Sequence, residues 1–154
     1  MDVVAGLVLN IVNQYLGSLR DAIGRGAHVR LLCPDPADEA VIRFSLFRSV
    51  FRTEPTHVTS DVLAHIEFAR SLRKEGVPFD IYTVPYLPPY GIIRITDGAG
   101  HDVLHVKLMA FKVGAGNFPV FTLTRNSGEW FEFFAEQLEL YFATGRPYPN
   151  PQKA

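Results

Sequence analysis

His105 and Lys107 stand two residues apart and are the pair in this sequence best suited to chemistry. Residues 103–111 alternate between two sets of side chains, as expected of a β-strand, so His105 and Lys107 share one face of that strand. An imidazole beside an ammonium group suits the oxygens of a phosphate or a carboxylate, and we add Arg94 as a third expected anion contact. From the alternation alone, an ordinary exposed sheet face is the favoured interpretation, with an anion-binding pair second and catalysis by a displaced motif third.

Three tyrosines, Tyr82, Tyr86 and Tyr90, recur at every fourth position of a proline-rich stretch. Such a stretch is extended, so the three rings are not all buried on one face. One interpretation is that Tyr82 and Tyr90 stack on a nucleobase or line a groove between subunits. The other is a rigid aromatic turn that covers the sheet.

The length, composition, net charge and cysteine count limit the class of protein to which this chain can belong. The chain has 154 residues, of which 47% are hydrophobic and 20% charged, values typical of one soluble globular domain. A net charge of −1 excludes the electrostatic footprint of a general nucleic-acid binder. The lone Cys33 excludes an internal disulfide and a cysteine-based zinc site, and favours a reducing cytoplasm.

Neither a membrane span nor a metal site is expected. The apolar run near the start, residues 3–12, is too short to cross a bilayer. His57, His65 and His101 are scattered without metal-ligand spacing, so we predict no metal and no cofactor. Asp35 and Asp38 follow a predicted strand, where we expect them to form a turn.

Hydrophobic periodicity and turn residues predict the elements that position these side chains. The expected helices are 3–24, 37–51, 59–75 and 126–142, and the expected strands are 28–33, 79–84, 91–96, 102–111 and 118–124. Helices and strands interleave first, and a strand meander follows. This order predicts an α/β fold, a layered mixed β-sheet flanked by helices, as one domain over residues 1–150 with 151–154 as a tail.

The last predicted helix, 126–142, carries apolar and aromatic residues over more than one stripe. A deeply buried helix has this composition. A helix that packs both on its own core and on a partner subunit has it too, because dimer interfaces use the same residue types. The sequence is consistent with both.

Two segments and the last helix carry a family resemblance. LRDAIGRGAHVRLLCPDP (19–36) combines a helix, a glycine turn and a strand. LRKEGVPFDIYTVPYLPPYGIIRITDG (72–98) repeats that order and adds a second strand with an Asp-Gly turn. With the closing WFEFFAEQLELYF, they resemble the phospholipase D-like superfamily. The resemblance implies a phospholipase D-like half-domain that pairs as a homodimer.

Active members of that superfamily carry His-x-Lys-x-x-x-x-Asp, in which His attacks or protonates, Lys binds phosphate and Asp supports the site. Carried over, these positions fall on Tyr90, Ile92 and Asp97. The chain therefore resembles a degenerate, single-copy member without catalytic residues. The implied function is ligand sensing or interaction, with a nucleotide or phosphorylated ligand, in a bacterial signalling or defence protein that has a fused or associated effector.

Two alternatives stand beside this interpretation. His105 and Lys107 form a true His-x-Lys in a second register, whose acidic position falls on Lys112, so a homodimeric phosphodiesterase or nuclease is one alternative. GLVLNIVNQYLGSL (6–19) and IYTVPYLPPYG (81–91) resemble STING-type cyclic-dinucleotide receptors, which bind ligand in a cleft between protomers. A receptor of that type is the other alternative.

Overall fold

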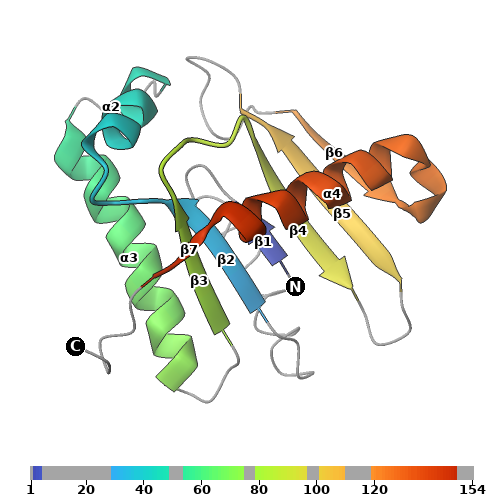
Figure 1. The fold of residues 1–154 in the computed structure, drawn as a ribbon, viewed down its shortest axis with the longest axis horizontal. Coiled ribbons are helices and arrows are strands. Elements are labelled where there is room, and N and C mark those ends of the chain that lie inside the picture. Colours follow the sequence, from blue (N-terminus) through green and yellow to red (C-terminus); the bar gives the residue numbers. More distant parts are fainter. Residues whose placement is uncertain are drawn as a thin grey trace.

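The computed structural model describes residues 2–4, 29–48, 54–74, 79–96, 101–109 and 119–148. Helix α4 crosses one face of a β-sheet, and helices α2 and α3 pack together beside strand β3 (Figure 1). The elements are β1 Asp2–Val4, β2 Val29–Pro34, α2 Glu39–Arg48, α3 Pro55–Lys74, β3 Phe79–Val84, β4 Tyr90–Thr96, β5 Asp102–Leu108, β6 Val120–Thr124, the 3₁₀ turn η2 Arg125–Ser127, α4 Glu129–Thr144 and β7 Arg146–Pro147.

The strands lie in the order β6-β5-β4-β1-β2-β3-β7. On one side, β4, β5 and β6 form an antiparallel meander. On the other, β2 and β3 run parallel, with β7 antiparallel at the edge. The three-residue strand β1 joins the two parts, because it pairs parallel with β2 and antiparallel with β4. The predicted α/β class with a mixed sheet and flanking helices is confirmed.

The main core lies between α4 and the sheet. Strands β2 to β6 contribute residues from one face, because alternate side chains of a strand reach the same face of the sheet. The helix supplies a stripe at three- and four-residue spacing. The buried members are Leu32, Val84, Ile92, Leu104, Val106, Leu123, Phe131, Phe134, Leu138, Tyr141 and Phe142.

The opposite face of β2 is buried as well. Its Leu31 and Cys33 alternate with the residues that face α4, and both are inaccessible to solvent. Helix α3 contacts β3 and buries Val58, Val62 and Ile66, which recur every four residues. Buried apolar side chains of this size contribute about 1.5–3 kcal/mol each to folding. Among the described helices, none is both long and apolar enough to cross a membrane.

The predicted first residues of two helices are wrong. Val3 and Val4, placed in the predicted helix 3–24, belong to strand β1, while residues 5–24 lie outside the described part of the chain. Helix α3 begins at Pro55, four residues before the expected start at residue 59. A proline is well tolerated in the first turn of a helix, because the N–H it lacks has no intrahelical acceptor there.

Two further elements differ from expectation. The last helix begins at Glu129 instead of Asn126, after the 3₁₀ turn and Gly128, whose φ of 60° suits glycine. Strand β7 was not predicted. It is a two-residue pairing at the sheet edge, and its register opposite Tyr82 and Thr83 depends on the path of the chain after α4.

Candidate functional site

His105 and Lys107 share one face of β5, as the alternation predicted, and this face points away from α4. Their neighbours Leu104 and Val106 are fully buried in the α4 core, whereas His105 and Lys107 are partly exposed. On the adjacent strands, Ile93 and Thr122 stand opposite His105. This surface, defined by His105, Lys107 and Thr122, is called the β5 patch below.

Two polar side chains of the β5 patch are in contact. The Nδ1 atom of His105 lies 3.0 Å from the hydroxyl oxygen of Thr122, within hydrogen-bond distance. Lys107 stands opposite Gly91 on β4, so no side chain rises beside it from that strand. Partial burial lowers the pKa of Lys107, because desolvation penalises the ammonium ion. An anion placed here regains that cost by pairing with the charge.

Arg94 does not join the β5 patch. It pairs with Leu104, so its side chain extends on the α4 face of the sheet, opposite to His105 and Lys107. There its guanidinium donates to Asp102, with Nη2 2.6 Å from Oδ2, and to Glu139 at 3.2 Å. The expected three-residue anion site is therefore split between the two faces of the sheet.

Asp102 is the centre of a charged cluster that sequence reasoning missed. Its carboxylate has no solvent exposure and accepts hydrogen bonds from Arg94, from the Thr96 hydroxyl at 3.2 Å and from Arg125 at 3.2 Å. The hydrogen bonds from Arg94 hold the pKa of Asp102 below its usual value against the opposing effect of burial. The sequence did hold a signal for this position. Asp102 lies two and four residues before Leu104 and Val106, so strand alternation places it on the same face as these core residues.

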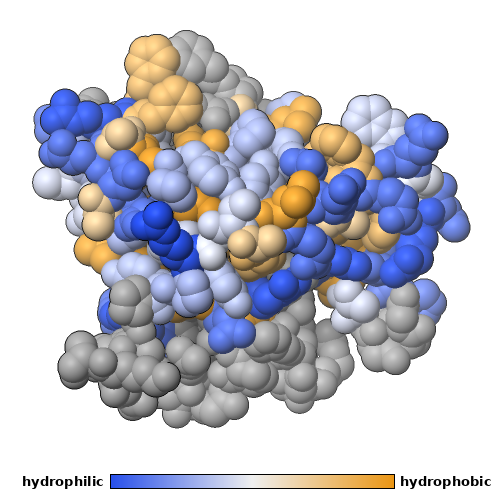
Figure 2. All heavy atoms as spheres, viewed as in Figure 1, coloured by the Kyte–Doolittle hydropathy of each residue, from blue (hydrophilic) through white to orange (hydrophobic). Residues whose placement is uncertain are grey.

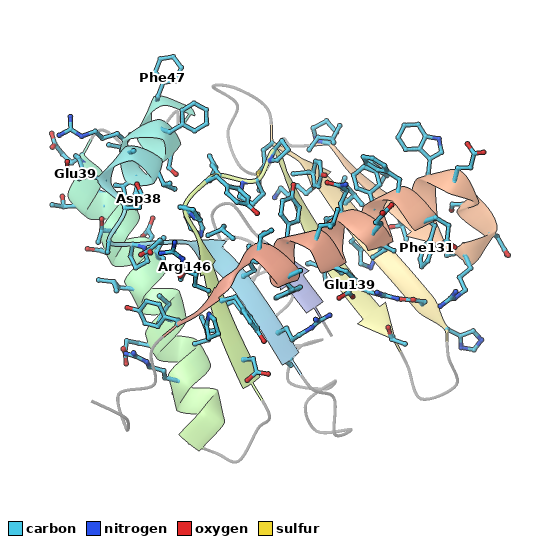
Figure 3. The ribbon with its side chains drawn as sticks, in the orientation of Figure 1. Asp38, Glu39, Phe47, Phe131, Glu139 and Arg146 are labelled. Atoms are coloured by element: carbon cyan, nitrogen blue, oxygen red, sulfur yellow. The ribbon has the colours of Figure 1, made fainter. Side chains whose placement is uncertain are left out.

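Glu139 extends this cluster from the helix. It projects from α4 over the sheet and forms ion pairs with Arg94 and, at 3.1 Å, with Arg30 of β2 (Figure 3). The Arg30 guanidinium also lies 4.3 Å from the centre of the Phe142 ring. The cluster therefore fastens α4 to strands of both parts of the sheet, and its chemistry is structural pairing.

Tyr82 and Tyr90 also lie on the α4 face, away from the β5 patch. The Tyr82 ring meets Phe142 edge-on at a centroid distance of 5.4 Å. The Tyr90 ring meets Phe134 edge-on at 5.2 Å, and its hydroxyl donates to Gln137 at 3.1 Å. Both rings are thus partners of α4, as in a rigid aromatic turn, and stacking on a nucleobase stays a prediction.

The positions to which the motif was carried over are occupied as follows. Tyr90 packs against the α4 core, and Ile92 is fully buried within it. Asp97 lies outside the described residues, as does Lys112. Neither Tyr90 nor Ile92 shares a face with the β5 patch, because the cross-strand partners of His105 and Lys107 are Ile93 and Gly91.

An open pocket of about 300 Å³ lies near the carboxyl end of β2, between the first turns of α2 and α3. Thr56, Thr59 and Ser60 line it together with Glu39. Asp35 and Asp38 are beside it and form the turn predicted from the sequence: Asp35 accepts from the Ala37 N–H at 2.9 Å and Asp38 caps α2. The pocket is open to solvent, and the Glu39 carboxylate opposes an anionic ligand.

Within the described ranges, no three His, Cys, Asp or Glu side chains are grouped closely enough to hold a metal ion. The β5 patch is accordingly the one arrangement among the described sequence-predicted residues that brings polar groups together on a partly exposed face. Comparison of the chain with protein-family models, with curated proteins and with solved structures gave no significant match.

Proposed function

We propose that this chain is a non-catalytic domain that binds a phosphorylated small molecule, a nucleotide in our first choice, at the β5 patch. The observation that carries the proposal is the shared strand face of His105 and Lys107, with the Thr122 hydroxyl 3.0 Å from the imidazole. These groups offer an ammonium, an imidazole and a hydroxyl to one set of phosphate oxygens. Charged hydrogen bonds of this kind are about twice as strong as neutral ones.

The partial burial of Lys107 supports an anion in preference to a neutral ligand. Its pKa is lowered by desolvation, and a bound phosphate raises it again. Binding is then linked to proton uptake by Lys107, so affinity falls as the pH rises toward the pKa of the free lysine. A neutral ligand has no such dependence.

The resemblance to phospholipase D-like half-domains supports a sensor role rather than catalysis. Phosphoryl transfer at the motif position requires a nucleophile and a cation directed at the substrate. Here Tyr90 donates to Gln137 and Ile92 is in the core, so both positions serve packing. A regulatory domain that reports a phosphorylated ligand to an attached effector is consistent with this change.

The test is a thermal-shift and calorimetry panel of ATP, GTP, cyclic di-AMP, cyclic di-GMP and inorganic phosphate on the full chain. A ligand at 100 times its dissociation constant stabilises the fold by about 2.7 kcal/mol, which raises the melting temperature by roughly 5–10 °C for a chain of this size. His105→Ala and Lys107→Met are expected to remove most of the response. Arg43→Met is the matched control, because Arg43 is an exposed cation on α2.

Three results contradict the proposal. One is the absence of a shift with every compound at millimolar concentration. A shift that Lys107→Met leaves unchanged places the ligand elsewhere. Release of a hydrolysed product from any compound, lost in His105→Ala, favours the phosphodiesterase alternative instead.

A further inference from the structure

Helix α4 carries a second apolar stripe that does not face the sheet. Trp130, Phe133 and Leu140 are 65%, 48% and 50% exposed, and Gln137 and Thr144 complete the row. The spacing of these five positions is three, four, three and four residues, the pattern by which one helix packs along another. This set is called the outer stripe below. Figure 2 shows the same face, with hydrophobic and hydrophilic residues interleaved along α4.

The outer stripe is held in place by contacts beneath it. Trp130 stacks at 6.3 Å on Phe134, and Phe133 meets the same ring edge-on at 5.1 Å. The Gln137 side chain accepts a hydrogen bond from the Tyr90 hydroxyl, and the Thr144 hydroxyl lies 2.9 Å from the Tyr86 hydroxyl. A surface whose side chains are fixed in this way loses little conformational entropy when a partner binds.

The charges next to the outer stripe select the kind of partner. Glu129 and Glu136 border it along the helix, Glu132 lies beyond them, and α4 contains no lysine or arginine. All three carboxylates are exposed. A second copy docked through this helix brings acidic rows together, and an anionic lipid surface is repelled in the same way. A partner with basic flanks is attracted.

We propose that the outer stripe docks an amphipathic helix of a partner protein, with apolar residues at three- and four-residue spacing and Lys or Arg on its flanks. The stripe extends about 21 Å, so it matches a helix of about 15 residues. Its three exposed apolar side chains offer roughly 300 Å² of surface, which is at the low end of interface sizes and predicts a weak, reversible complex. The outer stripe and the β5 patch lie on opposite sides of the sheet, and neither proposal depends on the other.

Trp130 is the only tryptophan of the chain, so its fluorescence reports directly on the outer stripe. The full chain is titrated with two synthetic 18-residue helices that lack tryptophan and share one leucine stripe. One peptide has lysine flanks, and the other has glutamate at the same positions. We expect a blue shift of Trp130 emission that saturates with the lysine peptide, weakens at high salt, and needs at least about tenfold more of the glutamate peptide.

Two variants and a matched control locate the contact. Phe133→Ser and Leu140→Ser are each expected to weaken binding of the lysine peptide about tenfold, because both lie in the centre of the stripe. Phe44→Ser is the control, since the Phe44 ring is 51% exposed on α2, which also presents Phe47 to solvent (Figure 3). Unchanged melting temperatures exclude a loss of fold as the cause.

Four outcomes overturn the docking proposal. The first is no blue shift with either peptide, and the second is equal affinity for both peptides. The third is a loss of binding in Phe44→Ser as large as that in Phe133→Ser or Leu140→Ser. The fourth is a blue shift that depends on protein concentration alone, accompanied by a dimer in sedimentation. That last result shows a second copy as the occupant, which is the homodimer expected from the sequence.

Discussion

Replacing Asp102 by asparagine tests whether the buried carboxylate fastens the sheet. The substitution keeps the size of the side chain but removes its charge, and it sets an amide N–H₂ against the donors of Arg94 or Arg125. Removing one partner of a fully buried ion pair costs about 3–5 kcal/mol. Arg94 keeps Glu139 and retains 21% side-chain exposure, and Arg125 is 63% exposed. We therefore expect Asp102→Asn to lower the free energy of unfolding by about 2–3 kcal/mol.

The pH dependence follows from the same carboxylate. Because the pKa of Asp102 is lower in the folded chain, the folded state favours its ionised form. This stabilisation is fully present above the unfolded pKa of about 4 and is lost as the pH falls through the lower folded pKa. The difference between the native chain and Asp102→Asn is therefore constant near neutral pH and shrinks below pH 4.

Urea unfolding followed by Trp130 fluorescence at pH 7, 5, 4 and 3 measures both effects. Glu139→Gln serves as the control in the same cluster, because Glu139 is half exposed and its loss is expected to cost under about 1 kcal/mol. A change below about 0.5 kcal/mol for Asp102→Asn at pH 7 refutes the argument. So does a difference that stays the same from pH 7 to pH 3.

Two further predictions concern single positions. Burial, and to a lesser extent the charge of Asp35, raises the pKa of the Cys33 thiol to about 12. We therefore expect Cys33 not to react with a disulfide reagent at pH 8 until urea unfolds the chain. Rapid labelling of the native protein contradicts this. Gly128 has φ 60° and ψ −132°, a conformation nearly exclusive to glycine, and a Cβ there meets no atom within 4 Å. Gly128→Ala is therefore expected to lose about 1–3 kcal/mol through backbone strain alone, and an unchanged melting temperature excludes that strain.

Local patterns were sufficient for much of the fold. Strand 79–84 and the antiparallel pair that begins at 91 and 102 follow from alternation and turn residues, which act within a few positions. Strand β1 escaped detection because its valines continue into an apolar run with helical spacing. Only pairing with β2 and β4, which are remote in the chain, makes Asp2–Val4 a strand.

In the candidate site too, local patterns were predictable from the sequence and pairing between strands was not. That His105 and Lys107 share a face is a property of one strand, and alternation predicted it. The face of Arg94 depends on the register between two strands, in which Arg94 is opposite Leu104 and Ile93 is opposite His105. A shift of one residue reverses the face, so the sequence did not show that Arg94 lies on the opposite face from His105 and Lys107.

The position of β1 has a consequence for how the chain matures during synthesis. Its hydrogen-bonding partner β2 leaves the ribosome well before its other partner, β4. Until Tyr90–Thr96 has emerged, a nascent sheet of β1, β2 and β3 presents the open edge of β1, with unpaired N–H and C=O groups. Completion of the β4–β5 hairpin covers that edge. Between the two events the open edge of β1 is able to pair with another chain, so we expect edge-to-edge association to be favoured at that stage.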